Sequence, residues 1–279
     1  MNEKRGGTTW RNPLVVENAC ATRIARNLLM GSELRRRAGT GFALGSFVIE
    51  SPTPATVSAL ALADFDFLVL DMEHSAIDFT RLELLLTAAH AAGIPALVRP
   101  WGEDGGLIGK ALDMGASGVM VPHVDSADRA RAVVAQARYA PMGSRGLCPH
   151  TGYDSLREPL RALDEATYVV IQIEGREAID RIGDIAAVPG IDAVFVGPYD
   201  LAMSLGVPPG SPEVNAAADR LAEKLPNGPT LGIYVDDPAR CADWSARRFA
   251  LQVVSFDGRM LANAARAVVA TARSGTRGK

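Results

Sequence analysis

The chain has 279 residues, of which 48% are hydrophobic and 22% are charged, and its formal net charge is −3. This length fits one large domain, since α/β barrels routinely form single units of about 250 residues. The small net charge provides no general positive field, so nucleic acid and anionic membrane surfaces are disfavoured as partners.

The N-terminal segment MNEKRGGTTWRNP is polar and has no apolar core of the kind a signal peptide needs. No later apolar run reaches the roughly 18 residues of a membrane span. We therefore expect a cytoplasmic protein. The cysteines Cys20, Cys148 and Cys241 are far apart and form no CxxC pair, so they predict neither a disulfide framework nor a thiolate zinc site.

Short apolar runs alternate with helix-like segments from residue 42 onward. The runs are continuous rather than alternating in polarity, which is typical of strands buried on both faces of a parallel sheet. Between two of them, apolar residues 82, 85, 86 and 89 share one helical face, with Thr80 as a candidate cap and Gly93 as a candidate end. The predicted strands are 42–48, 67–73, 95–100, 118–122, 168–174, 193–198, 230–235 and 249–257.

Eight β/α units predict a TIM barrel. A doubly wound open sheet is the alternative, but its usual glycine-rich turn is missing, because the first strand is followed by ESP without a GxGxxG motif. We expect residues 1–41 to form an N-terminal extension with a helix around ATRIARNLLMGSELRRRAG, whose arginines 35–37 face solvent. Residues 42–279 are the predicted catalytic barrel. The turn-rich segment APMGSRGLCPHTGYDS is expected to be an active-site loop.

Polar and ionisable side chains end several of the predicted strands. Because active sites in such barrels lie at the C-terminal ends of the strands, we expect these groups to meet at one mouth. Each alone has a structural explanation, such as a bond to loop amides, whereas the whole set indicates an active site. The candidates are Asp71, Glu73, His74, Arg99, Gln172, Glu174, Asp200 and Asp257.

The chemistry of these groups favours enolate formation. Glu174 and Asp200 are hard oxygen ligands suited to Mg²⁺ or Mn²⁺, and a metal held by two protein groups keeps positions open for a 2-oxo acid. His74 exchanges protons near neutral pH, and Arg99 keeps its charge for a developing oxyanion. A Schiff-base route is disfavoured because no lysine follows a predicted strand: the lysines are Lys4, Lys110, Lys224 and Lys279.

Asp113 lies in the last turn of a predicted helix, just before Gly115. The helix dipole disfavours a carboxylate there. The residue pattern leaves two interpretations open: a solvent-exposed acid, or an acid that holds a histidine in one tautomer.

Six segments resemble, in order and spacing, the class II pyruvate aldolases of the HpcH/HpaI family. The similarity covers roughly residues 40–265. It implies a (β/α)8 barrel, a homo-oligomer (trimer or hexamer) that shares its C-terminal helices, and reversible cleavage of a 4-hydroxy-2-oxo acid to a 2-oxo acid such as pyruvate and an aldehyde. The segments are FLVLDMEHS, LVRP, LDMGASGVMVPHV, RYAPMGSRG, VVIQIEGREAID and GIDAVFVGPYDLAMSLG.

The resemblance also implies roles for individual residues. Glu174 and Asp200 would hold a divalent metal, Mg²⁺ or Mn²⁺ with Co²⁺ as an alternative. His74 would be the base and Asp113 the acid that raises its basicity, while Arg99 would stabilise the transition state. Glu73 and Asp71 would be supporting residues. Substrate contacts would come from Gln172, Gly197, Pro198, Tyr199 and Asp200, with the amides of Tyr199 and Asp200 holding a carboxylate.

This chain departs from the family pattern at Ser75, at Tyr199, in the segment WGED and in the loop 146–154, where His150 and Tyr153 are candidate contacts for a second substrate. These departures motivate an alternative function, namely decarboxylation of an oxaloacetate-like acid with carbon–carbon bond formation in secondary metabolism. A non-catalytic scaffolding barrel is a third hypothesis, which the filled set of chemical positions disfavours.

Overall fold

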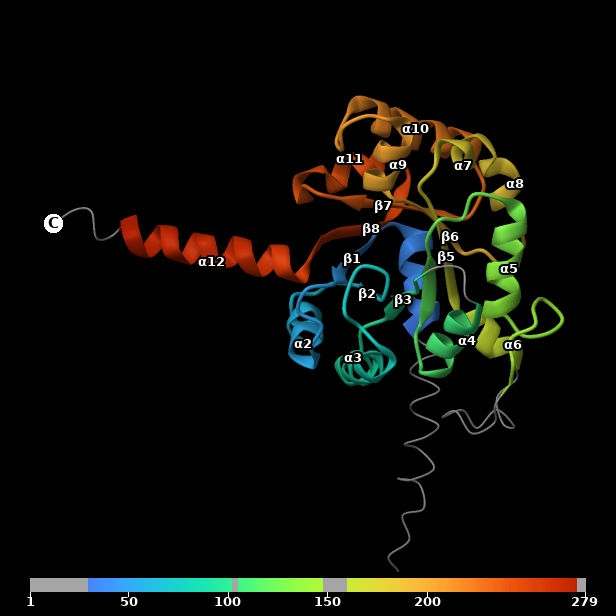
Figure 1. Ribbon diagram of the computed structural model, residues 1–279, viewed down its shortest axis with the longest axis horizontal. Coiled ribbons are helices and arrows are strands. Elements are labelled where there is room, and N and C mark those ends of the chain that lie inside the picture. The colour runs from blue at the N-terminus through green and yellow to red at the C-terminus, as the bar shows by residue number, and fades with distance from the viewer. Residues whose placement is uncertain (1–29, 102–104, 148–159, 275–279) are drawn as a thin grey trace, which may run out of the picture.

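The computed structural model of the chain describes residues 30–101, 105–147 and 160–274. Its strands form a closed barrel in which each strand pairs in parallel with the next and β8 pairs with β1 (Figure 1). The predicted TIM barrel is therefore confirmed, and the open sheet is excluded. The strands are β1 (Ala43–Val48), β2 (Phe67–Asp71), β3 (Ala96–Arg99), β4 (Gly118–Val121), β5 (Tyr168–Ile173), β6 (Ala193–Val196), β7 (Thr230–Val235) and β8 (Phe249–Phe256).

Helices follow the strands and surround the barrel. In α3 the helix begins after Asp78, whose side chain accepts a 2.8 Å hydrogen bond from the Arg81 amide, so the cap is Asp78 and not Thr80. Gly93 ends the helix as predicted, in the left-handed conformation with φ of 71°. The helices are α2 (Pro54–Leu62), α3 (Phe79–Ala92), α4 (Gly105–Asp113), α5 (Ala127–Ala137), α6 (Leu160–Ala166), α7 (Arg176–Asp180), α8 (Ile182–Ala186), α9 (Pro198–Leu205), α10 (Pro212–Lys224), the 3₁₀ turn η1 (Pro238–Arg240), α11 (Cys241–Ala246) and α12 (Asp257–Ser274).

The core has two layers because successive side chains of a strand point to opposite faces. One set of strand residues packs outward against the helices, as Leu68 and Leu70 do with Leu82 and Leu85. The alternate set fills the barrel interior. Both faces of every strand are thus buried, which explains why the strands read as continuous apolar runs.

Residues 30–40 are helical, which confirms the described part of the predicted N-terminal helix. Leu34 and Ala38 of this helix pack into the interior cluster, so the helix closes the end of the barrel at which the strands begin. Arg35 donates to Asp192 Oδ1 at 3.0 Å and to the Thr167 carbonyl at 2.8 Å. The expected solvent-facing position is therefore wrong for Arg35, although Arg36 is exposed.

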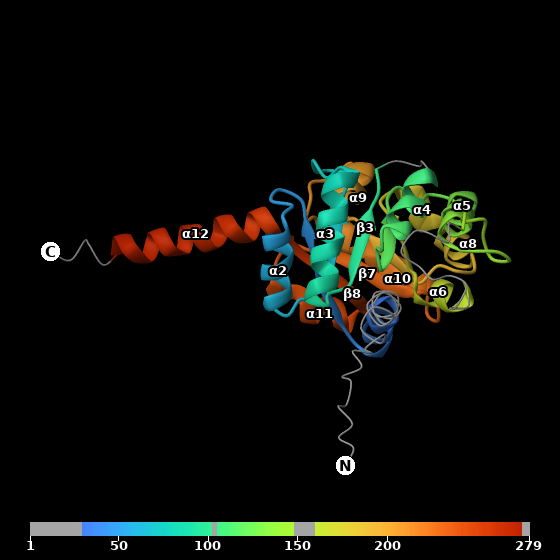
Figure 2. The same cartoon turned by 90° about the horizontal axis from the view of Figure 1, so that it is seen from below.

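Helix α12 projects away from the barrel instead of packing on it (Figures 1 and 2). Every residue from 263 to 274 is exposed. Leu261 and Val268, which are 66% and 69% exposed, share one side of the helix with Ala264, Ala265 and Ala272. No other part of the described chain packs against the apolar side of α12. No helix among the described residues is both long and apolar enough to cross a membrane.

Candidate active site

Asp71 and Arg99 form a buried ion pair at the ends of adjacent strands. The register of β2 and β3 places them side by side, and the guanidinium donates to both carboxylate oxygens at 2.9 and 2.6 Å. Burial lowers the pKa of Arg99, but the hydrogen bonds and negative charge of Asp71 outweigh it and the pKa is raised. Asp71 also accepts the amide hydrogens of Glu73 and His74. Asp71 therefore fixes both the guanidinium and the turn that carries His74.

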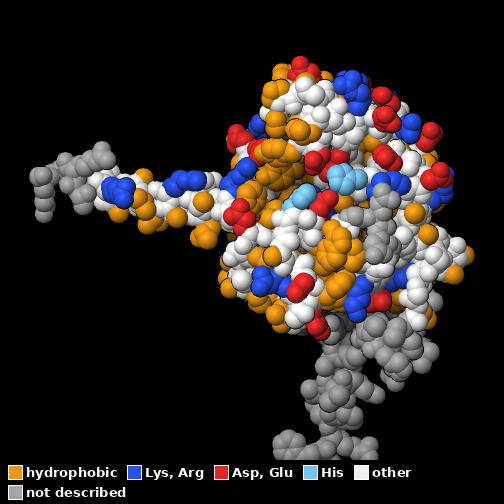
Figure 3. All heavy atoms as spheres, viewed as in Figure 1, with side chains coloured by type: hydrophobic (Ala, Val, Ile, Leu, Met, Phe, Trp, Pro, Cys, Tyr) orange, Lys and Arg blue, Asp and Glu red, His pale blue; other side chains and the backbone are white. Residues whose placement is uncertain are grey.

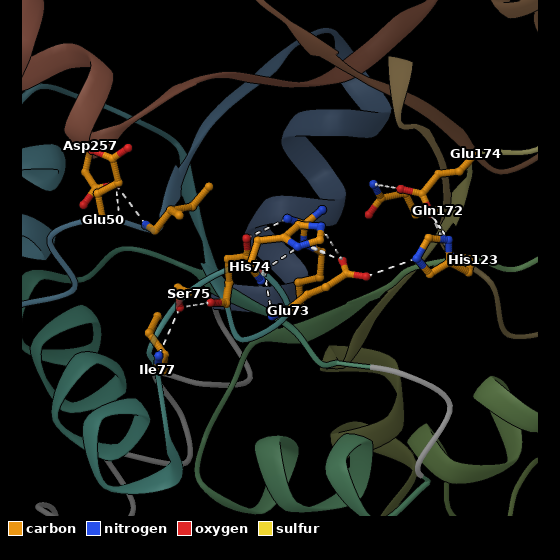
Figure 4. Close-up of polar contacts among 12 residues, drawn as sticks. Glu50, Glu73, His74, Ser75, Ile77, His123, Gln172, Glu174 and Asp257 are labelled. Atoms are coloured by element: carbon orange, nitrogen blue, oxygen red, sulfur yellow. Dashed lines mark hydrogen bonds and ion pairs between the residues drawn. The ribbon is translucent and has the colours of Figure 1, made fainter. Parts of the chain in front are cut away.

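Glu73 lies among positively charged and titratable groups at the same mouth (Figure 4). Its Oε2 is 3.3 Å from Arg99 Nε and 3.7 Å from His74 Nε2, and its Oε1 is 3.2 Å from His123 Nε2. Within the described residues, Oε2 has no hydrogen-bond partner although it is buried. Glu73 therefore brings negative charge to the centre of the mouth.

Glu174 follows β5 directly and is buried. Gln172 Nε2 donates to its Oε1 at 2.6 Å, and the amide of His123 donates to its Oε2 at 2.9 Å. Burial raises the pKa of Glu174, and the charges of Asp200 and Glu73 raise it further, against the opposing effect of His123. An ionised Glu174 therefore favours a cation beside it.

His123 was not among the sequence candidates. It follows β4 with a positive φ of 57°, and its ring bridges the acids: Nδ1 is 2.9 Å from Glu174 Oε2, and Nε2 is 3.2 Å from Glu73 Oε1. The sequence does contain a signal for this residue: His123 directly follows the fourth apolar run GVMVP, as the other candidates follow their apolar runs.

The start of α9 supplies the segment Gly197–Asp200. The first helical turn leaves its amide hydrogens without partners inside the helix, so the amides of Tyr199 and Asp200 suit a carboxylate. Gly197 has no room for a side chain, since a Cβ there would lie 2.7 Å from Glu174 Oε1 and 2.9 Å from Gln172 Nε2. The absence of a side chain at residue 197 lets Glu174 and Gln172 occupy their positions.

We expect Gly197→Ala to displace Glu174 and to weaken binding of Mn²⁺ by about 10- to 100-fold, a range typical of lost support for a metal ligand. The matched control is Gly175→Ala. Gly175 directly follows Glu174 in the chain, and a Cβ there would lie 3.9 Å from the Ser204 hydroxyl, which is an ordinary van der Waals distance. Calorimetric titration of both variants with Mn²⁺ checks this. Equal affinities in the two variants would contradict it.

One cavity of about 350 Å³ at this mouth is lined by His74, Arg99, Gln172 and Asp200, whereas Glu73, His123 and Glu174 are not part of its lining. It is within the range of small-ligand sites, about 300 to 1,000 Å³. Figure 3 shows histidine and acidic side chains on this face beside a band of hydrophobic side chains. The cavity is lined by Phe47, Ile49, His74, Arg99, Gln172, Phe195, Gly197, Pro198, Tyr199, Asp200, Tyr234, Phe256 and Arg259.

Two sequence candidates lie apart from this cavity. Asp113 accepts a 2.8 Å hydrogen bond from Arg145, and within the described residues it has no contact with His74, so its role as partner of the base stays a prediction. Asp257 accepts the amides of Ile49 and Glu50 at 2.9 and 3.2 Å. Asp257 therefore holds the loop after β1 and is not among the residues that line the cavity.

Ser75 caps the turn after β2. Its hydroxyl donates to the Asp71 carbonyl and accepts from the Ile77 amide at 3.1 Å (Figure 4). These bonds give the hydroxyl a structural role. His150 and Tyr153, the candidate contacts for a second substrate, lie outside the described residues.

The donor set fits a hard divalent cation. Among the described residues no group of three or more His, Cys, Asp or Glu side chains could hold a metal by itself. The negative charges of Asp200 and Glu73 both act on Glu174, and the buried Oε1 of Gln172 has no hydrogen-bond partner in the described part of the chain. Mg²⁺ and Mn²⁺ accept such oxygen donors and complete their octahedra with water or substrate.

A parallel barrel with a guanidinium, a histidine and carboxylates at its C-terminal mouth has the architecture of a TIM-barrel enzyme. The family model described as "HpcH/HpaI aldolase/citrate lyase" matches residues 45–264. The chain belongs to this family, which makes it a carbon–carbon lyase of the aldolase type, as the sequence predicted.

Named relatives support this assignment. The chain is 34% identical over 224 residues to a 2-dehydro-3,6-dideoxy-6-sulfogluconate aldolase of Pseudomonas putida, covering 78% of this chain and 88% of the relative. It is 36% identical over 231 residues to a hydroxypyruvate/pyruvate aldolase of Rhizorhabdus wittichii, covering 79% and 91%. The solved citrate synthase SbnG has 30% identity and a TM-score of 0.79, with 88% of this chain and 98% of that chain covered.

Proposed function

We propose that the chain uses a divalent metal to cleave a 4-hydroxy-2-oxo acid reversibly into pyruvate, or a related 2-oxo acid, and an aldehyde. The observation that carries the proposal is the meeting of His74, Arg99 and Asp200 in one cavity beside the buried Glu174. The aldolase names of the relatives support the same reaction.

Glu174 and Asp200 would hold the metal, which when bound would polarise the 2-oxo group of the substrate. The amides of Tyr199 and Asp200 orient the substrate carboxylate. Arg99, held in place by Asp71, stabilises the negative charge that develops on the enolate oxygen. Because Arg99 is positioned before substrate binds, this stabilisation needs little rearrangement.

His74 moves the proton. In the cleavage direction it accepts the proton of the C4 hydroxyl, the bond between C3 and C4 breaks, the aldehyde leaves and C3 of the enolate is then protonated. The side chain of His74 is 60% exposed and lines the cavity, so it reaches both substrate and solvent.

Exchange of the methyl hydrogens of pyruvate with deuterium tests the shared enolate step. We expect exchange in the presence of Mg²⁺ or Mn²⁺, its loss after chelation, and its loss in His74→Asn. The matched control His90→Asn changes a histidine on α3 whose ring meets the carbonyl of Gly115, away from the cavity lining. Exchange that persists after chelation would show that the proposal is wrong.

A second candidate is decarboxylation of an oxaloacetate-like acid followed by carbon–carbon bond formation. The similarity to the citrate synthase SbnG favours it, although the named aldolases fit the first candidate better. Metal-dependent release of carbon dioxide from oxaloacetate, with little pyruvate release from 4-hydroxy-2-oxo acids, would support the second candidate over the first.

We also propose that α12 docks on another copy of the chain to form a homo-oligomer. The support is its exposed apolar side and the shared C-terminal helices that the family resemblance implies. We expect the double variant Leu261→Asp/Val268→Asp to shift the protein to monomers, measured by light scattering after size-exclusion chromatography. Arg266→Asp, on the polar side of α12, is the control. A wild-type monomer at micromolar concentration, or an assembled double variant, would contradict the proposal.

A further inference from the structure

Five aromatic residues line the active-site cavity, next to the groups assigned to the reaction. Aromatic residues make up 6% of the chain. The rings of Phe47 and Tyr234 have centroids 6.1 Å apart, and those of Tyr199 and Tyr234 are 5.9 Å apart, both tilted. Phe195 and Phe256 line the same cavity. We call Phe47, Phe195, Tyr199, Tyr234 and Phe256 the aromatic surface.

A polar network holds one edge of this surface in place. Asp236, just after β7, accepts hydrogen bonds from the Tyr199 hydroxyl at 2.7 and 2.8 Å and from Arg259 Nη1 at 2.5 Å. The Arg259 guanidinium also lies over the Phe256 ring, 5.1 Å from its centroid. Asp236 thus connects α9 to the first turn of α12, and the rings are oriented before any ligand arrives.

The polar groups of Tyr199, Asp236 and Arg259 bond one another within this network, so they are less available to hydrogen-bond a ligand. Tyr199 donates its hydroxyl hydrogen to Asp236, and the charges of Asp236 and Arg259 balance each other. The surface facing the cavity is therefore mainly apolar.

The chemistry of such a surface favours one class of aldehyde over another. A polyhydroxylated aldehyde would lose water from several hydroxyl groups and find few partners for them on the rings. A flat aromatic ring loses little hydration and packs on tilted rings at favourable distances. The reacting carbonyl would at the same time reach His74 and Arg99, which line the same cavity.

We propose that the aromatic surface is the binding site for the ring of an aromatic aldehyde, and in the cleavage direction for an aryl group carried on C4 of the 4-hydroxy-2-oxo acid. This substrate class rests on the proposed aldolase function. Tyr234 and Phe256 are its specificity-determining residues. Arg259, held by Asp236, positions the Phe256 ring, and Tyr199, held by the same carboxylate, packs beside Tyr234.

The test compares condensation of pyruvate with benzaldehyde and with D-glyceraldehyde, in the presence of Mn²⁺, for the wild type, Tyr234→Leu and Phe256→Leu. The ratio of the two kcat/KM values is the readout. The control is Phe42→Leu, an exposed aromatic residue just before β1, at the opposite end of the barrel. Thermal melting of each variant shows that it is folded.

We expect the wild type to favour benzaldehyde, and each of the two variants to lower the ratio about tenfold while Phe42→Leu leaves it unchanged. A wild type that favours glyceraldehyde, or a ratio that neither variant changes, would overturn the proposed substrate class. Deuterium exchange into pyruvate separates the failures: exchange without use of benzaldehyde rejects the substrate class alone, whereas no exchange rejects the aldolase function and the substrate class with it.

Discussion

Glu174→Gln is expected to lower pyruvate release from 4-hydroxy-2-oxo acids about 10³-fold, which corresponds to roughly 4 kcal/mol of lost transition-state stabilisation. The amide keeps the shape of the side chain and its hydrogen bond from the His123 amide, but it removes the charge that holds a cation. A coupled assay for pyruvate, with and without chelator, measures the effect. Activity that survives both the substitution and the chelator would contradict the assigned role.

The melting temperature of Glu174→Gln shows whether the lost activity comes from the lost charge or from a destabilised fold. Because the folded-state pKa of Glu174 is raised, its ionised form disfavours the fold at pH values above that pKa, and this cost disappears as the pH falls through it. Gln resembles the protonated acid, so the metal-free variant is expected to melt at or above the wild-type temperature at pH 7. Saturating Mn²⁺ should raise the melting temperature of the wild type by several degrees and leave that of the variant unchanged. A variant that melts well below the wild type would indicate lost packing.

Asp71→Ala is expected to cost about 3 to 5 kcal/mol of unfolding free energy, because the buried guanidinium of Arg99 loses both of its hydrogen bonds to Asp71 and keeps the longer 3.3 Å contact with Glu73 Oε2. Asp71 is fully buried and Arg99 is 6% exposed, so solvent does not screen the pair. At roughly 2 to 4 °C per kcal/mol the melting temperature should fall by about 6 to 20 °C. Denaturant unfolding at fixed pH gives the free energy directly.

The double variant Asp71→Ala/Arg99→Met distinguishes an unpaired charge from lost packing. Removing both charges should restore much of the stability that the single substitution loses, since two apolar groups need no partner. It should leave pyruvate release impaired, because the oxyanion contact is missing. If the double variant were less stable than Asp71→Ala, the loss would come from the turn at Glu73 and His74.

The fold was predictable from the sequence because burial on both faces gives each barrel strand a recognisable apolar run. All eight predicted strands are present with ends shifted by at most a few residues, since pairing ends where the chain turns. The cap of α3 was less predictable. Asp78 and Thr80 are both good cap residues, and backbone geometry decides between them.

The candidate site was predictable where side chains end a strand or follow it directly, as Arg99 ends β3 and Glu174 follows β5. His123 follows the fourth apolar run in the same way, so the same rule applies to it. The contacts of Asp236 with Tyr199 and Arg259 could not be predicted, because they join residues 37 and 23 positions apart through the closure of the barrel. Spacing along the chain carries no signal for such contacts.

The first turn of α12 fixes how this helix is attached to the barrel. Asp257 bonds the amides after β1, and Arg259 bonds Asp236 after β7, so the root of the projecting helix is anchored to two sides of the barrel mouth. In the proposed homo-oligomer, an arm anchored in this way would lose little orientational freedom on docking, which would lower the entropic cost of association. Because Arg259 also borders the cavity, the same anchoring ties the geometry of the substrate pocket to the direction in which the arm points.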